Sequence, residues 1–219
     1  DARRAEALEP VEVGSSPGPL LAAAGAVWVV DAADDTLSRL DPARGQVTDT
    51  VEVGRSPLAV AATDEAVWGA NHGDDSRTPV PLAAAPGAVV AGDPVPSGGA
   101  RPVALLAAAG AVWAANYSSR SVGRIDPVAG RLVASYDVGE RPVALAEAGG
   151  AIWSADSDSD RVTRIDPASD WGALVAVEVG LRLVDGAMAL QTGLTVILLA
   201  PEAFLPLRQV GAQFHSSAA

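Results

Sequence analysis

The stretch GARPVALLAAAGAVWAANYSSRSVGRIDPVAG, residues 99–130, decides the fold because versions of it occur four times in the chain. Its tryptophan recurs at intervals of 40, 45 and 40 residues, as Trp28, Trp68, Trp113 and Trp153. A glycine stands 14 positions before each tryptophan and a proline 11 before it, and an Asp or Asn follows three positions later. Repetition at this period indicates a repeat architecture.

Each repeat divides into four short segments with the composition of β-strands. The segments are rich in β-branched, aromatic and small apolar residues, and Gly, Pro, Asx and Ser separate them. We expect the Asp or Asn after each tryptophan in the hairpin between strands two and three, where its side chain can bond the backbone two residues on, and the D-P-x-x-G turns in the next hairpin. Four strands per unit of about 40 residues predict the blade of a β-propeller.

The motifs V-G-x-x-P, V-W-x-A-N and R-I-D-P-x-x-G resemble the YVTN/YncE-type β-propeller repeats of bacteria, and the related propeller of virginiamycin B lyase, over residues 7–170. Such families usually close with six or seven blades. We therefore expect an all-β fold, a partial β-propeller of about four four-stranded blades, followed by a helical hydrophobic C-terminal tail. A complete four-bladed ring is the alternative.

The expected organisation follows the motif positions. It comprises 1–13 as a linker and the last strand of a preceding blade, 14–53 as blade 1, 54–98 as blade 2, 99–138 as blade 3, 139–171 as blade 4 and 172–219 as the tail. Blade 2 carries a Pro/Gly-rich insertion and lacks D-P-x-x-G. Because proline cannot donate to a central ladder, its outer strands should be edge-like or replaced by a loop. We favour drift in a surface loop over a binding element there.

The period ends near Gly172, within RIDPASDWGALVAVEVG at 164–180. The charge-free run 187–200 is shorter than the roughly 20 residues of a membrane span. Residues 173–219 resemble the last transmembrane helices of the ABC exporter subunit for cytochrome-bd assembly or thiol-reductant export, through the short turn GAMALQTG at 186–193 and PEAFLPLR at 201–208. We interpret the chain as a fragment or chimera joined near 168–180, and a true fusion of propeller and membrane anchor is the alternative.

Composition restricts the chemistry. A net charge of −12 disfavours nucleic acid, because attraction to phosphate supplies most non-specific affinity. The absence of cysteine removes disulfides and thiolates, and no G-x-x-x-x-G-K-[ST] motif occurs. Asp156, Asp158 and Asp160 alternate like the start of a calcium loop. Arg161 and Pro167 occupy the positions where that loop needs Gly and Glu, so these three are weak metal candidates.

No catalytic or cofactor-binding residue can be assigned. The lyase-like resemblance implies His and Glu near a magnesium ion, but the two histidines, His72 and His215, do not align to such a set. The four tryptophans are expected in the core. The three arginines that stand two positions before D-P are expected as structural features of the blades: Arg39, Arg124 and Arg164. No serine lies in a G-x-S-x-G elbow.

Three functions remain as hypotheses. The first is a non-enzymatic β-propeller scaffold in an extracytoplasmic bacterial setting, which binds a protein or small molecule on a propeller face. The second is a fragment of the exporter's transmembrane subunit, membrane-associated through 173–214. The third is a metal-dependent lyase of the virginiamycin B lyase kind. No cofactor is expected for the first.

Overall fold

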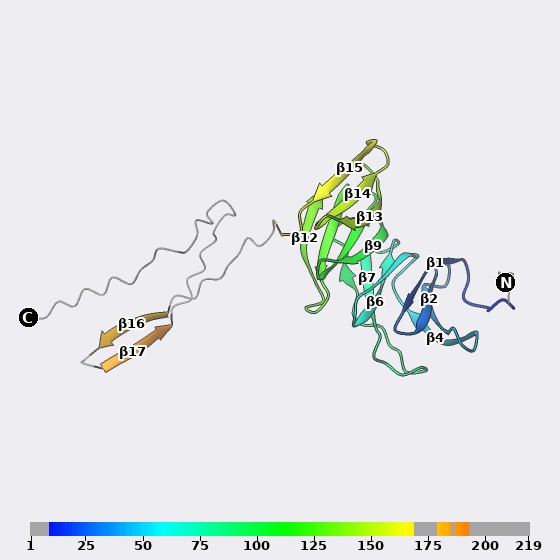
Figure 1. Cartoon of the computed structure of the whole chain (residues 1–219), viewed down its shortest axis with the longest axis horizontal. Coiled ribbons are helices and arrows are strands. Elements are labelled where there is room, and N and C mark those ends of the chain that lie inside the picture. The colour runs from blue at the N-terminus through cyan, green and yellow to red at the C-terminus, as the bar shows by residue number, and fades with distance from the viewer. Residues whose placement is uncertain (1–8, 169–178, 185–186, 193–219) are drawn as a thin grey trace, which may run out of the picture. The chain divides into compact units, whose positions relative to one another are not determined.

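The computed structural model describes residues 9–168, 179–184 and 187–192, which fall into two compact units, 1–167 and 168–219. The first unit contains four antiparallel sheets (Figure 1). Sheet 1 has β1 (Pro17–Ala23), β2 (Ala26–Asp31), β3 (Thr36–Asp41) and β4 (Gln46–Glu52). Sheet 2 has β5 (Pro57–Ala62), β6 (Ala66–Asn71), β7 (Ser76–Pro81) and β8 (Val95–Pro96). Sheet 3 has β9 (Pro102–Ala108), β10 (Ala111–Asn116), β11 (Ser121–Asp126) and β12 (Arg131–Asp137). Sheet 4 has β13 (Pro142–Ala148), β14 (Ala151–Asp156) and β15 (Arg161–Ile165).

The sheets are arranged as in a propeller. Within each sheet the strands pair in chain order, and the first strands of consecutive sheets lie against each other: β1 on β5, β5 on β9 and β9 on β13. The all-β class and the four-stranded antiparallel sheets predicted from the repeats are therefore confirmed, with sheet 4 showing three strands in the described residues. Residues 9–13 form no strand, and residues 1–8 lie outside the described part of the chain.

The hydrophobic core lies between the sheets in three clusters. Trp28 packs with residues of sheets 1 and 2, Trp68 with residues of sheets 2 and 3, and Trp113 with residues of sheets 3 and 4. These three indoles are buried, whereas Trp153, in the last sheet described, is half-buried. Second strands such as β10 are buried along their whole length, as expected for a sheet covered on both faces.

A buried Asp or Asn ends the second strand of every sheet. Asp31 ends β2, and its Oδ2 accepts hydrogen bonds from Ser38 Oγ at 2.6 Å and Thr36 Oγ1 at 3.3 Å on the neighbouring β3. The expectation that this residue lies in the hairpin loop and bonds the backbone two residues on is wrong for Asp31. The carboxylate is buried and takes its partners from hydroxyls of the third strand instead.

The glycine that opens each repeat lies against the buried Asp or Asn of the second strand, which leaves no room for a side chain at the glycine position. A Cβ on Gly14 would lie 2.7 Å from Cβ of Asp31, and a Cβ on Gly54 would lie 2.6 Å from Cγ of Asn71. A Cβ on Gly99 would likewise lie 2.7 Å from Cβ of Asn116. Real Cβ atoms do not approach other carbons so closely, so only glycine fits at this point of the chain.

The insertion in blade 2 replaces most of an outer strand, as its prolines predicted. After β7 the chain forms a loop over 82–94, and β8 contains only two residues. The loop contacts sheet 1, because Arg39 Nη1 donates to the carbonyl oxygen of Ala84 at 3.1 Å and the Gly87 N–H donates to Asp49 Oδ1 at 2.6 Å. It therefore connects sheets 1 and 2.

The tail is described only at β16 (Val179–Val184) and β17 (Ala187–Thr192), which pair as an antiparallel hairpin. These twelve positions are strands where a helix was expected. The remainder of the expected helical tail, 172–219, lies outside the described residues. Within the described part of the chain, no helix has the length and apolarity needed to cross a membrane.

We expect Gly54→Ala to destabilise the fold by about 1–3 kcal/mol, since an added methyl group must displace Asn71. Gly18→Ala is the matched control, because its Cβ would meet no heavy atom closer than 3.8 Å. Urea unfolding of the two variants measures the difference. Equal stability of both variants would contradict the steric role of Gly54.

We expect Arg77→Leu to stabilise the protein by about 1–4 kcal/mol. Arg77 is fully buried, and burial lowers its pKa to about 9. The folded chain thus holds this proton less tightly than the unfolded chain, so folding is penalised below pH 9 and the penalty is relieved as the pH rises above that value. The advantage of Arg77→Leu should therefore shrink above pH 9. Arg77→Lys, which keeps a buried cation, should give no gain in thermal or urea unfolding, and a gain equal to that of leucine would refute the charge argument.

Candidate binding site

The second-to-third-strand hairpins and the G-x-x-P loops meet at one end of the strands, which we call the hairpin end. Each hairpin donates a backbone N–H to the loop that enters its own sheet, as Tyr117 does to the carbonyl oxygen of Arg101 at 2.9 Å and Ser157 to that of Arg141 at 3.0 Å. The residue before each proline has positive φ, between 49° and 56°. Hairpins and loops are therefore held in the same conformation around the whole array.

The last hairpin residue of one sheet joins it to the next sheet. Asp35 Oδ1 accepts a hydrogen bond from the Ser56 N–H at 2.8 Å, and Asp75 Oδ1 accepts one from the Arg101 N–H at 2.7 Å. The carbonyl oxygen of Asp35 also accepts the Val53 N–H at 2.9 Å. A side-chain carboxylate and a backbone carbonyl thus close the first two junctions.

The third junction departs from this arrangement. Arg120 occupies the position of Asp35 and Asp75, and its carbonyl oxygen still accepts the Val138 N–H at 2.9 Å. Its side chain cannot accept a hydrogen bond, and it forms an ion pair with Glu140 at 2.9 Å instead. The backbone of the junction is preserved while the carboxylate is replaced by a cation.

Two adjoining hollows of about 380 and 450 Å³ lie at this junction, and we call them together the arginine hollow. Its charged and aromatic lining consists of Arg101, Tyr117, Arg120, Glu140, Arg141, Asp158 and Arg161. Arg141 pairs with Asp158 at 2.8 Å and lies 5.4 Å above the Tyr117 ring. Four guanidinium groups against two carboxylates give the site an excess of positive charge in an acidic chain.

The neighbouring hairpins explain why this region alone of the described hairpin end is basic. The hairpins of sheets 1 and 2 carry paired carboxylates, at Asp34 with Asp35 and at Asp74 with Asp75. In sheet 3 the matching residues are Ser119 and Arg120. Comparison of the four copies at this position, which reads Asp, Asp, Arg and Asp, is the sequence signal that would have found the site.

The weak metal candidates do not converge. Asp156 is buried, and its oxygens accept hydrogen bonds from Ser154 Oγ at 2.7 Å and Thr163 Oγ1 at 2.5 Å. Asp158 lies in the arginine hollow beside Arg141, and Asp160 is exposed. Within the described residues no group of three or more acidic or histidine side chains could hold a metal ion, so the magnesium implied by the lyase resemblance finds no fitting ligand set there.

The two histidines and the three repeated arginines were also considered from the sequence. His72 lies at the start of the β6–β7 hairpin and is half-buried, and His215 is outside the described residues. The three repeated arginines lie over the tryptophan rings at 5.4–5.9 Å, as Arg39 over Trp28, Arg124 over Trp113 and Arg164 over Trp153. Sheet 2 has Pro79 opposite Trp68 instead. These arginines are blade features, as expected.

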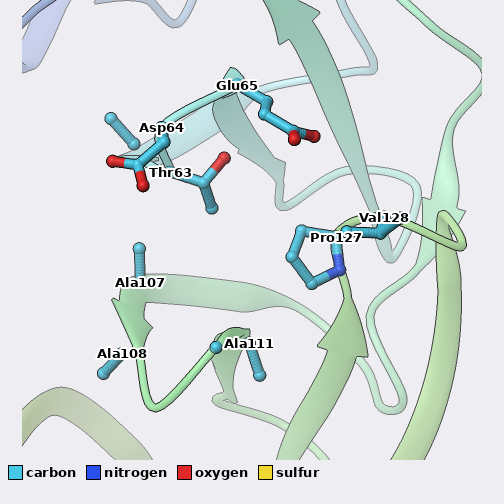
Figure 2. Close-up of a pocket in the computed structure, with 10 residues that line it drawn as sticks. Thr63, Asp64, Glu65, Ala107, Ala108, Ala111, Pro127 and Val128 are labelled. Carbon is cyan, nitrogen blue, oxygen red and sulfur yellow. The ribbon is translucent and has the colours of Figure 1, made fainter.

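A second hollow, of about 390 Å³, lies at the opposite end of the strands (Figure 2). Three turns form it, around Thr63 to Glu65, Ala108 to Ala111, and Pro127 with Val128. Its walls are largely alanine and proline, and the polar groups come from one turn, so it offers a ligand little directional recognition. The arginine hollow is therefore the stronger candidate.

We expect calcium to leave the melting temperature unchanged, because the oxygens of Asp156 are already engaged. Asp156→Ala should cost about 1–3 kcal/mol, since buried hydroxyl donors lose their acceptor, whereas Asp158→Ala, which removes an exposed ion pair, should cost less than about 1 kcal/mol. Differential scanning fluorimetry with calcium or a chelator measures all three. A rise in melting temperature with calcium that Asp158→Ala removes would contradict this assignment.

For the four sheets, comparison with known proteins supports the β-propeller-like fold alone. No family model matches the chain. The computationally designed Ika4 protein superposes with a TM-score of 0.59 at 18% identity over 73% of this chain and 98% of its own. Virginiamycin B lyase from Staphylococcus aureus gives 0.56 at 18% identity over 70% of this chain and 52% of its own. The chain thus spans about half the length of that lyase.

A separate similarity concerns a short stretch. The glutathione/L-cysteine transport system ATP-binding/permease protein CydC of Bacillus subtilis is 53% identical over 45 residues, which are 20% of this chain and 8% of that protein. The match is too short to assign the chain to a family.

Proposed function

We propose that this β-propeller-like chain is a non-enzymatic binding scaffold in an extracytoplasmic bacterial setting, and that the arginine hollow holds its ligand. The observation that carries the proposal is the change of chemistry at the third junction, where Arg120 replaces the carboxylate that closes the first two. The exchange removes a hydrogen bond between sheets and so brings no gain in stability of its own. A binding function explains why the backbone is kept and the side chain is altered.

The hollow also has the makeup of a binding site. Tyr117 presents a half-buried ring between charged side chains, and Arg141 stacks on it at 5.4 Å. Aromatic and arginine side chains contribute strongly to recognition, because an aromatic ring offers a large surface and a guanidinium group offers several donors. The described residues bring no nucleophile, base and orienting group together there, so binding is better supported than catalysis.

We expect ligands found by a thermal-shift screen of small charged and neutral molecules to lose their effect in Tyr117→Ala. Tyr136→Phe is the control, because Tyr136 packs on Trp113 and lies outside the hollow. The screen should use the full chain, and a bound ligand should raise the melting temperature with the logarithm of its concentration once that concentration exceeds the Kd. Ligand effects that Tyr117→Ala leaves intact would place binding elsewhere. Turnover of a streptogramin B substrate with magnesium would replace the proposal by the lyase alternative.

The exporter alternative is favoured by one observation. The chain is 53% identical over 45 residues to CydC, the ATP-binding/permease protein of a transport system. Under this alternative 173–214 associates with a membrane and the chain needs detergent to remain dispersed. A chain that stays monomeric without detergent in size-exclusion chromatography would count against it.

A further inference from the structure

Resting on the proposed function, we infer that the arginine hollow binds an anionic oxygen group, a carboxylate or phosphate, where the first two junctions hold an aspartate carboxylate. The repeat itself defines this position. At the first two junctions an Asp Oδ1 lies 2.7–2.8 Å from the N–H of the residue before proline. The protein therefore already builds an anion position twice, with its own side chain as the anion.

The third junction keeps the donor of that position. Arg141 is the residue before Pro142 and has φ 52°, against 49° for Ser56 and 56° for Arg101. Its N–H therefore has the orientation that donates to a carboxylate at the other junctions. Among the described residues no acceptor is found for this N–H, whereas Ser56 and Arg101 each have one. Arg141 is exposed, so this N–H is open to water and equally to an oxygen of a ligand in the hollow.

The side chains around this donor suit an anion. Arg120 replaces the aspartate at the junction, and Arg101 and Arg161 line the hollow without a carboxylate partner in the described part of the chain. A guanidinium group offers planar paired donors that match the oxygens of a carboxylate or phosphate. Stacking on Tyr117 limits the positions of the Arg141 side chain.

The two acidic residues of the hollow do not prevent this binding. Glu140 pairs with Arg120, and Asp158 pairs with Arg141, through side chains that are 39–65% exposed. Ion pairs this exposed are weak, and each guanidinium has five N–H donors, so it can contact a second anion while one pair persists. An anion would also balance the two guanidinium groups that lack carboxylate partners.

The substitution Arg120→Asp tests the inference directly, because it places at the third junction the residue found at the first two. The new carboxylate should accept the Arg141 N–H and occupy the anion position itself. We expect this variant to melt at a higher temperature than the natural chain and to bind inorganic phosphate or succinate at least about tenfold more weakly. A variant that fails to bind for want of folding would melt lower, so the two causes are separable.

The control is Asp35→Asn, which alters the first junction, away from the hollow. It should lower the melting temperature, because the Ser56 N–H loses a charged acceptor, while anion binding stays unchanged. Isothermal titration of the full chain with phosphate and with succinate, in separate arms at low ionic strength, measures affinity and shows which anion is preferred. In ¹H–¹⁵N spectra, the Arg141 amide should move on titration with the anion that binds.

Equal anion affinity in the natural chain and Arg120→Asp would overturn the inference, as would an Arg141 amide that does not respond to either anion. If neither anion binds but ligands from the thermal-shift screen still lose their effect in Tyr117→Ala, the anion inference fails while the proposed binding function stands. If the screen also yields no ligand of the hollow, both fail.

Discussion

The packing of a glycine against a buried Asp or Asn is the constraint on which the rest of the structure depends. The loop that enters a sheet can pass the end of the second strand only at a residue without a Cβ. Gly14 is such a residue, beside Asp31. The buried side chain needs partners, because an unpaired polar group inside a protein is costly. Hydroxyl groups on the third strand supply them. One contact therefore joins three parts of each sheet and sets the hairpin end on which the candidate site is built.

Further contacts then join one sheet to the next. Tryptophans fill the space between sheets, and arginines on the third strand cover their rings and extend to the following sheet, as when Arg124 Nη1 donates to the carbonyl oxygen of Pro167 at 3.0 Å. The insertion of sheet 2 contributes a similar contact through Ala84. At the hairpin end the connection is a carboxylate, and this is the contact that the third junction exchanges for an arginine. The site therefore arises where the chain departs from its own repeat.

Much of the fold was predictable from sequence because its determinants repeat. The period of the tryptophans, the positions of Gly and Pro and the missing strand pattern in the insertion reflect local rules that each copy obeys. The inward turn of Asp31 was not predictable from its local sequence, because its partners lie on the next strand. The burial of Arg77 was missed for another reason: Leu37 and Val122 occupy the matching buried places in sheets 1 and 3, and only a comparison of the copies at this position indicates a buried arginine. The arginine hollow is lined by residues of adjacent copies. A consensus repeat has Asp at the position of Arg120, so it hides the one copy that differs.

Amide hydrogen exchange at Ser56, Arg101 and Arg141 tests the central claim most directly, since the three N–H groups hold equivalent places at consecutive junctions. The account predicts that Ser56 and Arg101, which donate to Asp35 and Asp75, are protected, and that Arg141 exchanges markedly faster in anion-free buffer. Protection of Arg141 equal to that of the other two, without any added anion, would contradict the view that the third junction lacks the carboxylate contact of its siblings.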